Sequence, residues 1–138
     1  MDFTFNEEQT MIQDQVQQFV QKEYDWETRQ ELSNSDKGFG ADNWKTFAEL
    51  GWLGISVSED NGGFGGSAIE TMLIMEEFGK GLVVEPFLET IVMSSSVLDK
   101  HGNEEHKKEV LGSVISGELH LALAYAEPQS RFNLFDVV

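Results

Sequence analysis

Glycine is concentrated in one short segment, Asn61-Gly62-Gly63-Phe64-Gly65-Gly66, and a loop of this composition can bind phosphate through its backbone. The two common phosphate-loop patterns do not fit this segment. Ala68 stands where the last glycine of G-x-G-x-x-G belongs, and no lysine follows as G-x-x-x-x-G-K-[ST] requires. We therefore expect a tight turn with positive φ angles, which also lets the backbone approach a neighbouring segment closely.

Side chains that could act as metal ligands or nucleophiles are scarce. The chain has no cysteine, which excludes disulfides, thiolate catalysis and cysteine-based zinc sites. His101, His106 and His120 are isolated, without metal-ligand spacing, so we predict no metal site. Glu89 stands among apolar residues early in a predicted helix. A solvated Glu89 would only favour the positive end of that helix, whereas an inward-pointing Glu89 would be a feature of a pocket.

The overall charge restricts the classes of partner. The 138 residues include 25 acidic and 9 basic side chains, which gives a formal net charge of −16. Such a chain repels nucleic acids and anionic membranes. The N-terminus lacks the layout of a signal peptide, and no window approaches the ~18 apolar residues of a membrane span. We expect one soluble domain with a packed core, because 40% of its residues are hydrophobic. We expect a cytoplasmic location, with which the absence of cysteine is compatible.

Apolar periodicity and capping residues predict a succession of helices, so the fold class is mainly α. Asn6 and Gln9 form a capping box before an amphipathic helix that is expected to fray near residues 24–26. Asp42 is expected to cap a short helix that stops at Gly51. The first helix is polar except for one apolar stripe, and this pattern predicts a helix at the surface whose stripe packs on the core.

The following helices are predicted to be more deeply buried. Ser67 and Glu70 form a second capping box, for a helix over about 68–79 with apolar residues on most of its faces. That pattern predicts a central helix, of which one face could instead line an apolar ligand cavity. Pro86 opens the next helix, and Asn103 caps a last one that Gly117 stops.

The periodicity changes after Gly117. Leu119, Leu121, Leu123 and Tyr125 alternate with small residues, which predicts a strand that Glu127-Pro128 terminates. The remaining residues to Val138 include apolar groups that need partners outside this sequence. We therefore expect that the chain is the front part of a larger protein.

Four segments in this order resemble the acyl-CoA dehydrogenase family, and the resemblance spans the whole chain. They are Phe5 to Gln9, Glu49 to Ile55 with Gly62 to Gly66, Glu76 to Gly81, and Gly102 to Lys108 followed by Ser116 to Glu118 and Ala124 to Pro128. The resemblance implies the N-terminal helical domain of that fold over residues 1–117. Residues 118–138 would then begin a truncated middle β-domain.

What the family does implies a function for the whole protein. Its members oxidise acyl-CoA thioesters to 2-enoyl-CoA with FAD as the cofactor, and they pass the electrons to a transfer partner. A carboxylate in the C-terminal bundle of the family removes the α-proton, so the resemblance implies no catalytic residue here and an inactive 138-residue fragment. The residues implied at the flavin are Leu123, Tyr125 and Ala126, and those implied at the substrate are Glu89 and Ser130.

The same resemblance implies that helices 68–78 and 86–98 wall the acyl-chain pocket. At the flavin edge this chain departs from the usual Thr-Glu-Pro and Ser-Asp motifs, because Ala126 and Phe132 occupy positions where other residues are expected. The departures resemble the small subunit of pimeloyl-CoA dehydrogenase, one subunit of a two-subunit enzyme. A homo-oligomer or a heteromer with a second acyl-CoA dehydrogenase subunit is therefore expected. A non-catalytic subunit and a free-standing helical interaction domain are the alternative functions.

Overall fold

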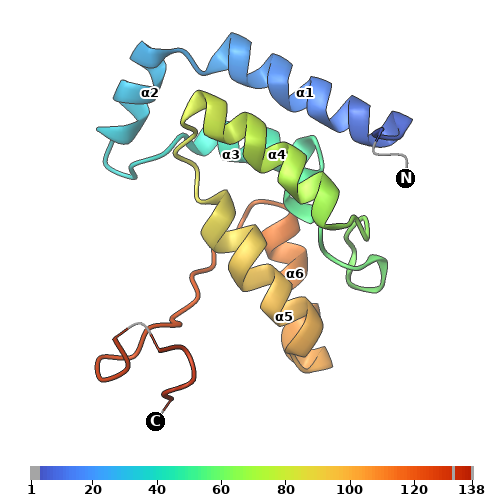
Figure 1. The fold of residues 1–138 in the computed structure, drawn as a ribbon, viewed down its shortest axis with the longest axis vertical. Coiled ribbons are helices and arrows are strands. Elements are labelled where there is room, and N and C mark those ends of the chain that lie inside the picture. Colours follow the sequence, from blue (N-terminus) through green and yellow to red (C-terminus); the bar gives the residue numbers. More distant parts are fainter. Residues whose placement is uncertain (1–3, 132, 138) are drawn as a thin grey trace.

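The computed structural model describes residues 4–131 and 133–137, and within these ranges every regular element is helical (Figure 1). The α-helices are α1 (Glu7–Glu23), α2 (Trp26–Ser33), α3 (Ala41–Glu49), α4 (Ala68–Gly81), α5 (Ser96–His101) and α6 (Glu104–Ile115). Two 3-10 turns, η1 (Trp52–Gly54) and η2 (Glu59–Asn61), connect α3 to the glycine-rich segment. A π-helix, η3 (Leu88–Ser95), runs directly into α5.

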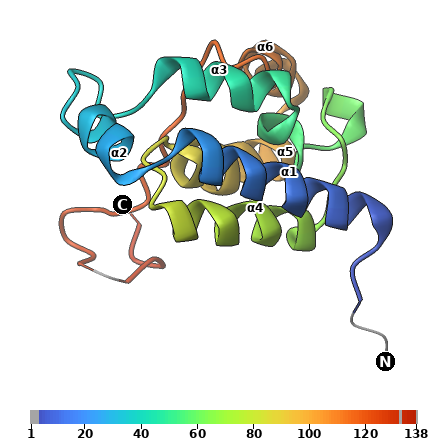
Figure 2. The same ribbon diagram turned by 90° about the horizontal axis from the view of Figure 1, so that it is seen from above.

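The helices pack as a bundle in which α1 and α4 lie side by side (Figures 1 and 2). The continuous η3–α5 helix pairs with α6, and α6 also contacts the turns η1 and η2. Phe47 of α3 lies at the centre of an aromatic cluster, with ring centroids 4.9 Å from Phe78 of α4 and 5.2 Å from Trp52 of η1. Phe19 of α1 meets the Phe47 ring edge-on at 5.3 Å. Aromatic burial therefore joins α1, α3, α4 and η1 into one core.

The predicted capping boxes are confirmed. Asn6 accepts the Gln9 N–H at 2.8 Å while the Gln9 side chain accepts the Asn6 N–H, and Ser67 and Glu70 make the corresponding pair. Asn103 caps α6 through the His106 N–H as predicted. These caps need only residues three apart in the sequence, which is why sequence patterns reveal them.

One predicted helix cap is wrong, and one helix was not predicted. Asp42 does not cap α3: the helix begins at Ala41 after Gly40, which makes no side-chain cap, and Asp42 lies in the first turn. The first helix ends at Glu23, close to the predicted residues 24–26, but a further helix follows at once. Asp25 caps a further helix, α2, through the Thr28 N–H at 2.8 Å. Asp25 followed by Thr28 is a capping signal that the apolar pattern alone did not reveal.

The predicted burial of α4 on most faces is also wrong. Its buried side chains are Leu73, Ile74, Glu77 and Phe78, whereas Ile69 and Met72 remain 42% and 48% exposed. One face of α4 therefore packs on the core and the other presents apolar side chains outward.

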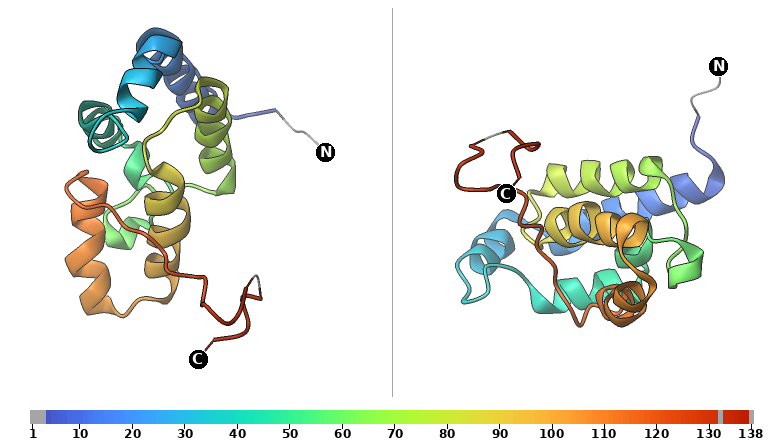
Figure 3. Two further views of the ribbon diagram at one scale, coloured as in Figure 1. Left: turned by 90° about the vertical axis from the view of Figure 1, so that its left-hand side faces the viewer. Right: turned by 90° about the horizontal axis from the view of Figure 1, so that it is seen from below.

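The strand predicted over residues 119–126 is wrong, since within the described residues this segment is irregular. A strand requires a neighbouring strand for its N–H and C=O groups. Here the Leu119 N–H donates to the Ser113 carbonyl at 3.0 Å instead, and Leu121 bonds to the Thr90 side chain. The segment crosses the start of the η3–α5 helix (Figure 3). The alternating pattern thus has no partner strand in the part of the chain that the structure describes.

Candidate functional site

A cavity of about 400 Å³ lies between the end of α4, the loop that follows it and the start of η3. Its walls are mainly apolar and include Met75 and Phe78 of α4, Val83 of the loop, and Leu88 of η3. Three charged residues also line it, namely Arg29, Glu85 and Glu89. An apolar cavity with a few polar groups suits a flexible, largely hydrophobic ligand.

Glu85 is a buried carboxylate, 6% exposed, that carries no ion pair among the described residues. Its Oε2 accepts the Tyr24 hydroxyl at 2.6 Å, and its Oε1 accepts the Asn43 Nδ2 at 2.9 Å and the Gly40 N–H at 3.2 Å. Tyr24 in turn accepts the Val84 N–H at 2.9 Å. Three elements far apart in the sequence therefore fix one wall of the cavity. Sequence reasoning missed this network, because nothing local to Glu85 indicates its partners.

The Tyr24 hydroxyl remains a donor in this network at ordinary pH. Burial raises the pKa of Tyr24, and the hydrogen bond to Glu85 raises it further. The Val84 N–H and the Arg29 charge act in the opposite direction but do not cancel the effect. Tyr24 is therefore protonated and donates its hydroxyl proton to the Glu85 carboxylate.

Arg29 and Glu89 lie on the rim of the cavity. The Arg29 Nε donates to the Leu82 carbonyl at 3.1 Å, and its guanidinium lies 5.6 Å from the Trp26 ring centroid. Glu89 is exposed in the first turn of η3. The structure thus brings the predicted substrate residue Glu89 to an apolar cavity between the two predicted wall helices.

The predicted flavin residues lie elsewhere. Leu123 lines a second cavity of about 330 Å³ together with Val92, Met93 and Val97 of the η3–α5 helix. The side chains of Leu123 and Tyr125 are 37% and 57% exposed, so this edge presents apolar surface outward. Ala126 is exposed as well. Leu123 and Glu89 do not line the same cavity among the described residues.

Ser130 is buried in a turn of the chain rather than directed at either cavity. Its hydroxyl donates to the Glu127 carbonyl at 3.0 Å, and its N–H donates to the same oxygen at 3.1 Å. The oxygen of that hydroxyl keeps lone pairs that could accept a hydrogen bond. Phe132, which the sequence analysis singled out, lies outside the described residues.

The glycine-rich segment is the predicted tight turn and not a phosphate loop. Gly62 and Gly65 have positive φ angles of 85° and 64°. Each backbone N–H group of residues 62–66 donates to a backbone carbonyl within residues 54–59. Since phosphate loops bind through free N–H groups, this loop lacks the donors it would need.

Asp99 of α5 fastens the same turn to the bundle. It accepts the Ser58 hydroxyl and the Asn61 Nδ2, each at 2.7 Å. Burial raises the pKa of Asp99, but these hydrogen bonds outweigh it and hold the pKa below its usual range.

No metal site is formed by the described residues, since no group of three potential ligands meets there. His120 stacks on the Trp44 ring with centroids 4.7 Å apart, and Phe39 lies 5.1 Å away. Burial, with a smaller effect of Lys37, lowers the pKa of His120. The imidazole is thus part of an aromatic stack, a role that its isolation in the sequence did not indicate.

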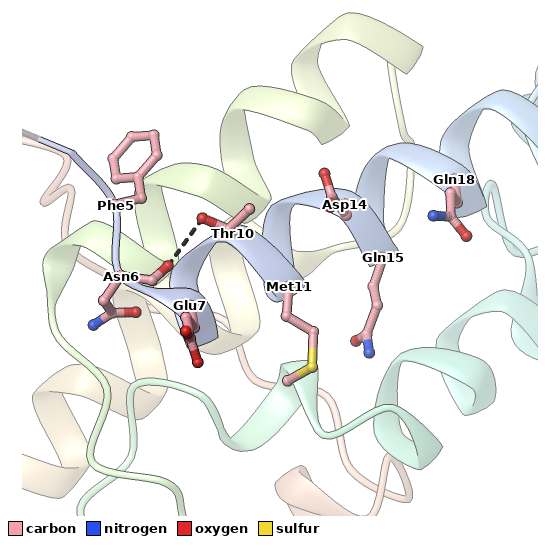
Figure 4. A pocket seen from close by; sticks show the side chains of 8 residues that line it. All are labelled: Phe5, Asn6, Glu7, Thr10, Met11, Asp14, Gln15 and Gln18. Carbon is pink, nitrogen blue, oxygen red and sulfur yellow. Dashed lines mark hydrogen bonds between the residues drawn. The ribbon is translucent and has the colours of Figure 1, made fainter.

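A third hollow, of about 510 Å³, lies along the outer face of α1 (Figure 4). Figure 4 shows that its lining comes only from α1 and the residues just before it, including Phe5 and Met11. Thr10 uses its hydroxyl within the helix, on the Asn6 carbonyl at 2.9 Å. This hollow contains none of the predicted site residues and no group with evident chemistry.

Comparison with known proteins identifies the family. The profile of the family described as "Acyl-CoA dehydrogenase, N-terminal domain" matches residues 6–118. This chain belongs to that family. The family predicted from the four sequence segments is therefore confirmed, together with its helical N-terminal domain.

Individual relatives show the same correspondence. Acryloyl-CoA reductase (NADH) of Anaerotignum propionicum is 30% identical over 94% of this chain and 33% of its own length. The crystal structure of an acyl-CoA dehydrogenase complexed with FAD from Bacillus anthracis superposes with a TM-score of 0.84 and 28% identity, over 96% of this chain and 23% of that one. The crystal structure of the ChsE4-ChsE5 complex from Mycobacterium tuberculosis superposes with a TM-score of 0.81 and 26% sequence identity. The match covers 88% of this chain and 34% of that one.

The match covers only part of the relatives' own length. This chain spans about a third of the length of the curated relatives that it matches, such as the 33% covered in acryloyl-CoA reductase. In the part that the structure describes, no helix is both long and apolar enough to cross a membrane.

Proposed function

We propose that this chain supplies the N-terminal domain of an FAD-dependent acyl-CoA dehydrogenase, which oxidises an acyl-CoA thioester to 2-enoyl-CoA. The match of the family profile over residues 6–118 is the observation that carries the proposal. In this proposal residues 1–117 are the helical domain, since Gly117 with φ 79° ends α6 there, and residues 118–138 begin the middle β-domain.

The cavity between α4 and η3 is the proposed site of the acyl chain. Its apolar walls would exclude water from the chain, and Glu89 on the rim would contact the substrate. Ser130 is the second proposed substrate residue; it lies in a turn away from this cavity, and the free lone pairs of its hydroxyl oxygen would accept a hydrogen bond, since its proton is donated to Glu127. The hydrogen bonds of Glu85 to Tyr24 and Asn43 would hold one wall of this site in place.

The segment Leu123 to Ala126 fits one edge of a flat ring system. Leu123 and Tyr125 present apolar side chains outward, and Ala126 adds no bulk between them and a ring. When bound, FAD supplies a hydride acceptor for the oxidation. This chain's own part is to hold one edge of the ring with these residues and to keep water from it.

A second candidate is a non-catalytic subunit that retains this fold for assembly while a partner supplies the flavin site. Two observations favour it: Ala126 lacks the hydroxyl that the family motif has there, and one relative in fold is a complex of two chains. Acyl-CoA, an electron-transfer acceptor and a second acyl-CoA dehydrogenase subunit are the proposed partners in both cases.

The experiment is to co-express this chain, carrying an affinity tag, with a candidate acyl-CoA dehydrogenase subunit from the same genome. We expect a complex that carries flavin and reduces an artificial electron acceptor when acyl-CoA is added. A colourless complex that oxidises no acyl-CoA would contradict the proposal. Stoichiometric FAD on this chain alone would contradict the non-catalytic alternative. A monodisperse monomer that binds neither FAD nor a partner would favour a free-standing interaction domain.

A further inference from the structure

Thr90 connects the π-helix to the segment that follows α6. Its side chain is fully buried, and its Oγ1 both donates to the Leu121 carbonyl at 3.2 Å and accepts the Leu121 N–H at 3.3 Å. One hydroxyl thus satisfies both backbone groups of a residue 31 positions away, as the residue of a neighbouring strand would do.

This use of a helical threonine is unusual within the molecule. The hydroxyls of Thr10, Thr46 and Thr71 each donate to the carbonyl four residues earlier in their own helices. That local bond is the ordinary one for threonine in a helix. The Thr90 hydroxyl instead bonds to the backbone of Leu121.

The π-helix holds Thr90 in this position. The backbone N–H of Thr90 donates to the Pro86 carbonyl at 3.0 Å, and the Thr90 carbonyl accepts the Ser95 hydroxyl at 2.7 Å. Ser94 makes the same five-residue bond to Glu89 at 2.6 Å. The π-helix Leu88–Ser95 lies where the bundle meets the irregular segment that follows α6.

Two hydrogen bonds of Thr90 attach that segment to the helices. Among the described residues, the hydrogen bonds that join residues 120–126 to the helices are the two between Thr90 and Leu121. Leu121 also packs against the core, and Leu123, two residues later, lines the cavity on the η3–α5 helix. Fixing Leu121 therefore fixes the position from which Leu123, Tyr125 and Ala126 project.

We propose that Thr90 is a positioning residue. Its hydroxyl bonds to the Leu121 backbone as a neighbouring strand would, and it thereby fixes where Leu123 to Ala126 lie relative to the η3–α5 helix. This role at the flavin edge rests on the proposed function. Thr90 itself does not touch the flavin; it acts through the Leu121 backbone.

The first test is amide hydrogen exchange in the 138-residue chain, which needs no flavin. In Thr90→Val the Leu121 amide should exchange about tenfold faster, and the peptide over 119–126 with it, because both hydrogen bonds are lost. Thr90→Ser keeps the hydroxyl and should restore slow exchange. Thr71→Val is the matched control, since its hydroxyl bonds only within α4, and it should leave this peptide unchanged. If Thr90→Val does not fold, Thr90→Ala gives the same comparison without the added branched methyl group.

The second test uses the flavin-containing complex described above. Thr90→Val should shift the visible flavin spectrum and lower the flavin content at least severalfold, and Thr90→Ser should restore both. If the Leu121 amide of Thr90→Val exchanged at the wild-type rate, Thr90 would not attach the segment to the helices, and the proposal would be overturned. Faster exchange with an unaltered flavin spectrum and content would overturn the positioning role. A wild-type complex without flavin would overturn the proposed function, and the exchange experiment would still decide whether Thr90 fastens the segment.

Discussion

The buried carboxylate of Glu85 is held by neutral donors and not by a cation, so each donor matters. Replacing Tyr24 by phenylalanine keeps the ring in the core but removes the hydroxyl that donates to Glu85 and accepts from Val84. Because a hydrogen bond to a buried charged group is lost, we expect the free energy of unfolding to fall by about 2 kcal/mol.

Urea denaturation measures this change. Tyr125→Phe is the matched control, because Tyr125 is 57% exposed, and it should change the stability by less than about 0.5 kcal/mol. Equal stabilities of the two variants would show that the Tyr24 hydroxyl does not support the cavity wall.

The aromatic stack around His120 makes one contribution to stability depend on pH. Burial lowers the pKa of His120 below the ordinary 6.5, so the unfolded chain binds a proton more readily than the folded chain. The contribution is fully present above pH 6.5 and is lost as the pH falls through the lower folded pKa. NMR titration of the imidazole should give a midpoint below 6.5.

A second variant tests whether the packing against Trp44 lowers the pKa of His120. In Trp44→Leu, the stacking partner 4.7 Å from His120 is removed, and the His120 midpoint should move back toward 6.5. A wild-type midpoint at or above 6.5 would contradict the structure at this residue.

At the scale of elements, the capping box of α4 also ties that helix to α1. Glu70 accepts the Ser67 hydroxyl and N–H, each at 2.6 Å, and the Gln9 Nε2 at 2.8 Å. Burial raises the pKa of Glu70, but these hydrogen bonds outweigh it and lower the pKa from 4.5 to about 2. The stability that Glu70 contributes is therefore present above pH 4.5 and is lost as the pH falls toward 2.

Acid unfolding of variants tests this contribution. Glu70→Gln should be less stable than the wild type above pH 4.5, and the difference should shrink as the pH falls toward 2. Ser67→Ala removes the hydroxyl that donates to Glu70, so the stability of this variant should depend on pH less steeply than that of the wild type. A difference between wild type and Glu70→Gln that stays constant with pH would contradict the assignment.

The turn between η2 and α4 depends on backbone contact at Gly63. A Cβ atom there would lie 2.2 Å from the Val57 carbonyl oxygen, so the turn must shift to accept any side chain. We expect Gly63→Ala to lower the free energy of unfolding by about 2 kcal/mol. Gly112→Ala is the control, because a Cβ in this exposed turn of α6 meets nothing within 4 Å, and it should stabilise by about 0.8 kcal/mol. Thermal unfolding of both variants distinguishes the two effects by their sign.

The elements also show what sequence reasoning can reach. Asn6 with Gln9, Ser67 with Glu70, and the positive-φ turn at Gly62 were predictable, because their partners lie a few residues away. The Glu85 network was not, since its donors come from residues 24–43 and no local pattern links them. The strand after Gly117 was predicted from a correct alternation, but pairing requires a second strand, and Thr90 takes that place among the described residues.

At the scale of the whole molecule, both the cavity beside η3 and the separate segment after α6 present apolar side chains outward. Leu88 and Tyr125 remain 44% and 57% exposed, and the chain spans about a third of its relatives' length. Transfer of a hydride requires a site from which water is excluded, and here no further part of the chain covers these side chains among the described residues. We therefore predict that the 138-residue chain, given FAD, acyl-CoA and an artificial acceptor, shows no turnover. The assay should be run beside the co-expressed complex, in which we expect the partner to cover the exposed apolar edge and activity to appear. Turnover by the chain alone would mean that these residues already form a complete site, and it would place the proton-abstracting carboxylate within residues 1–138.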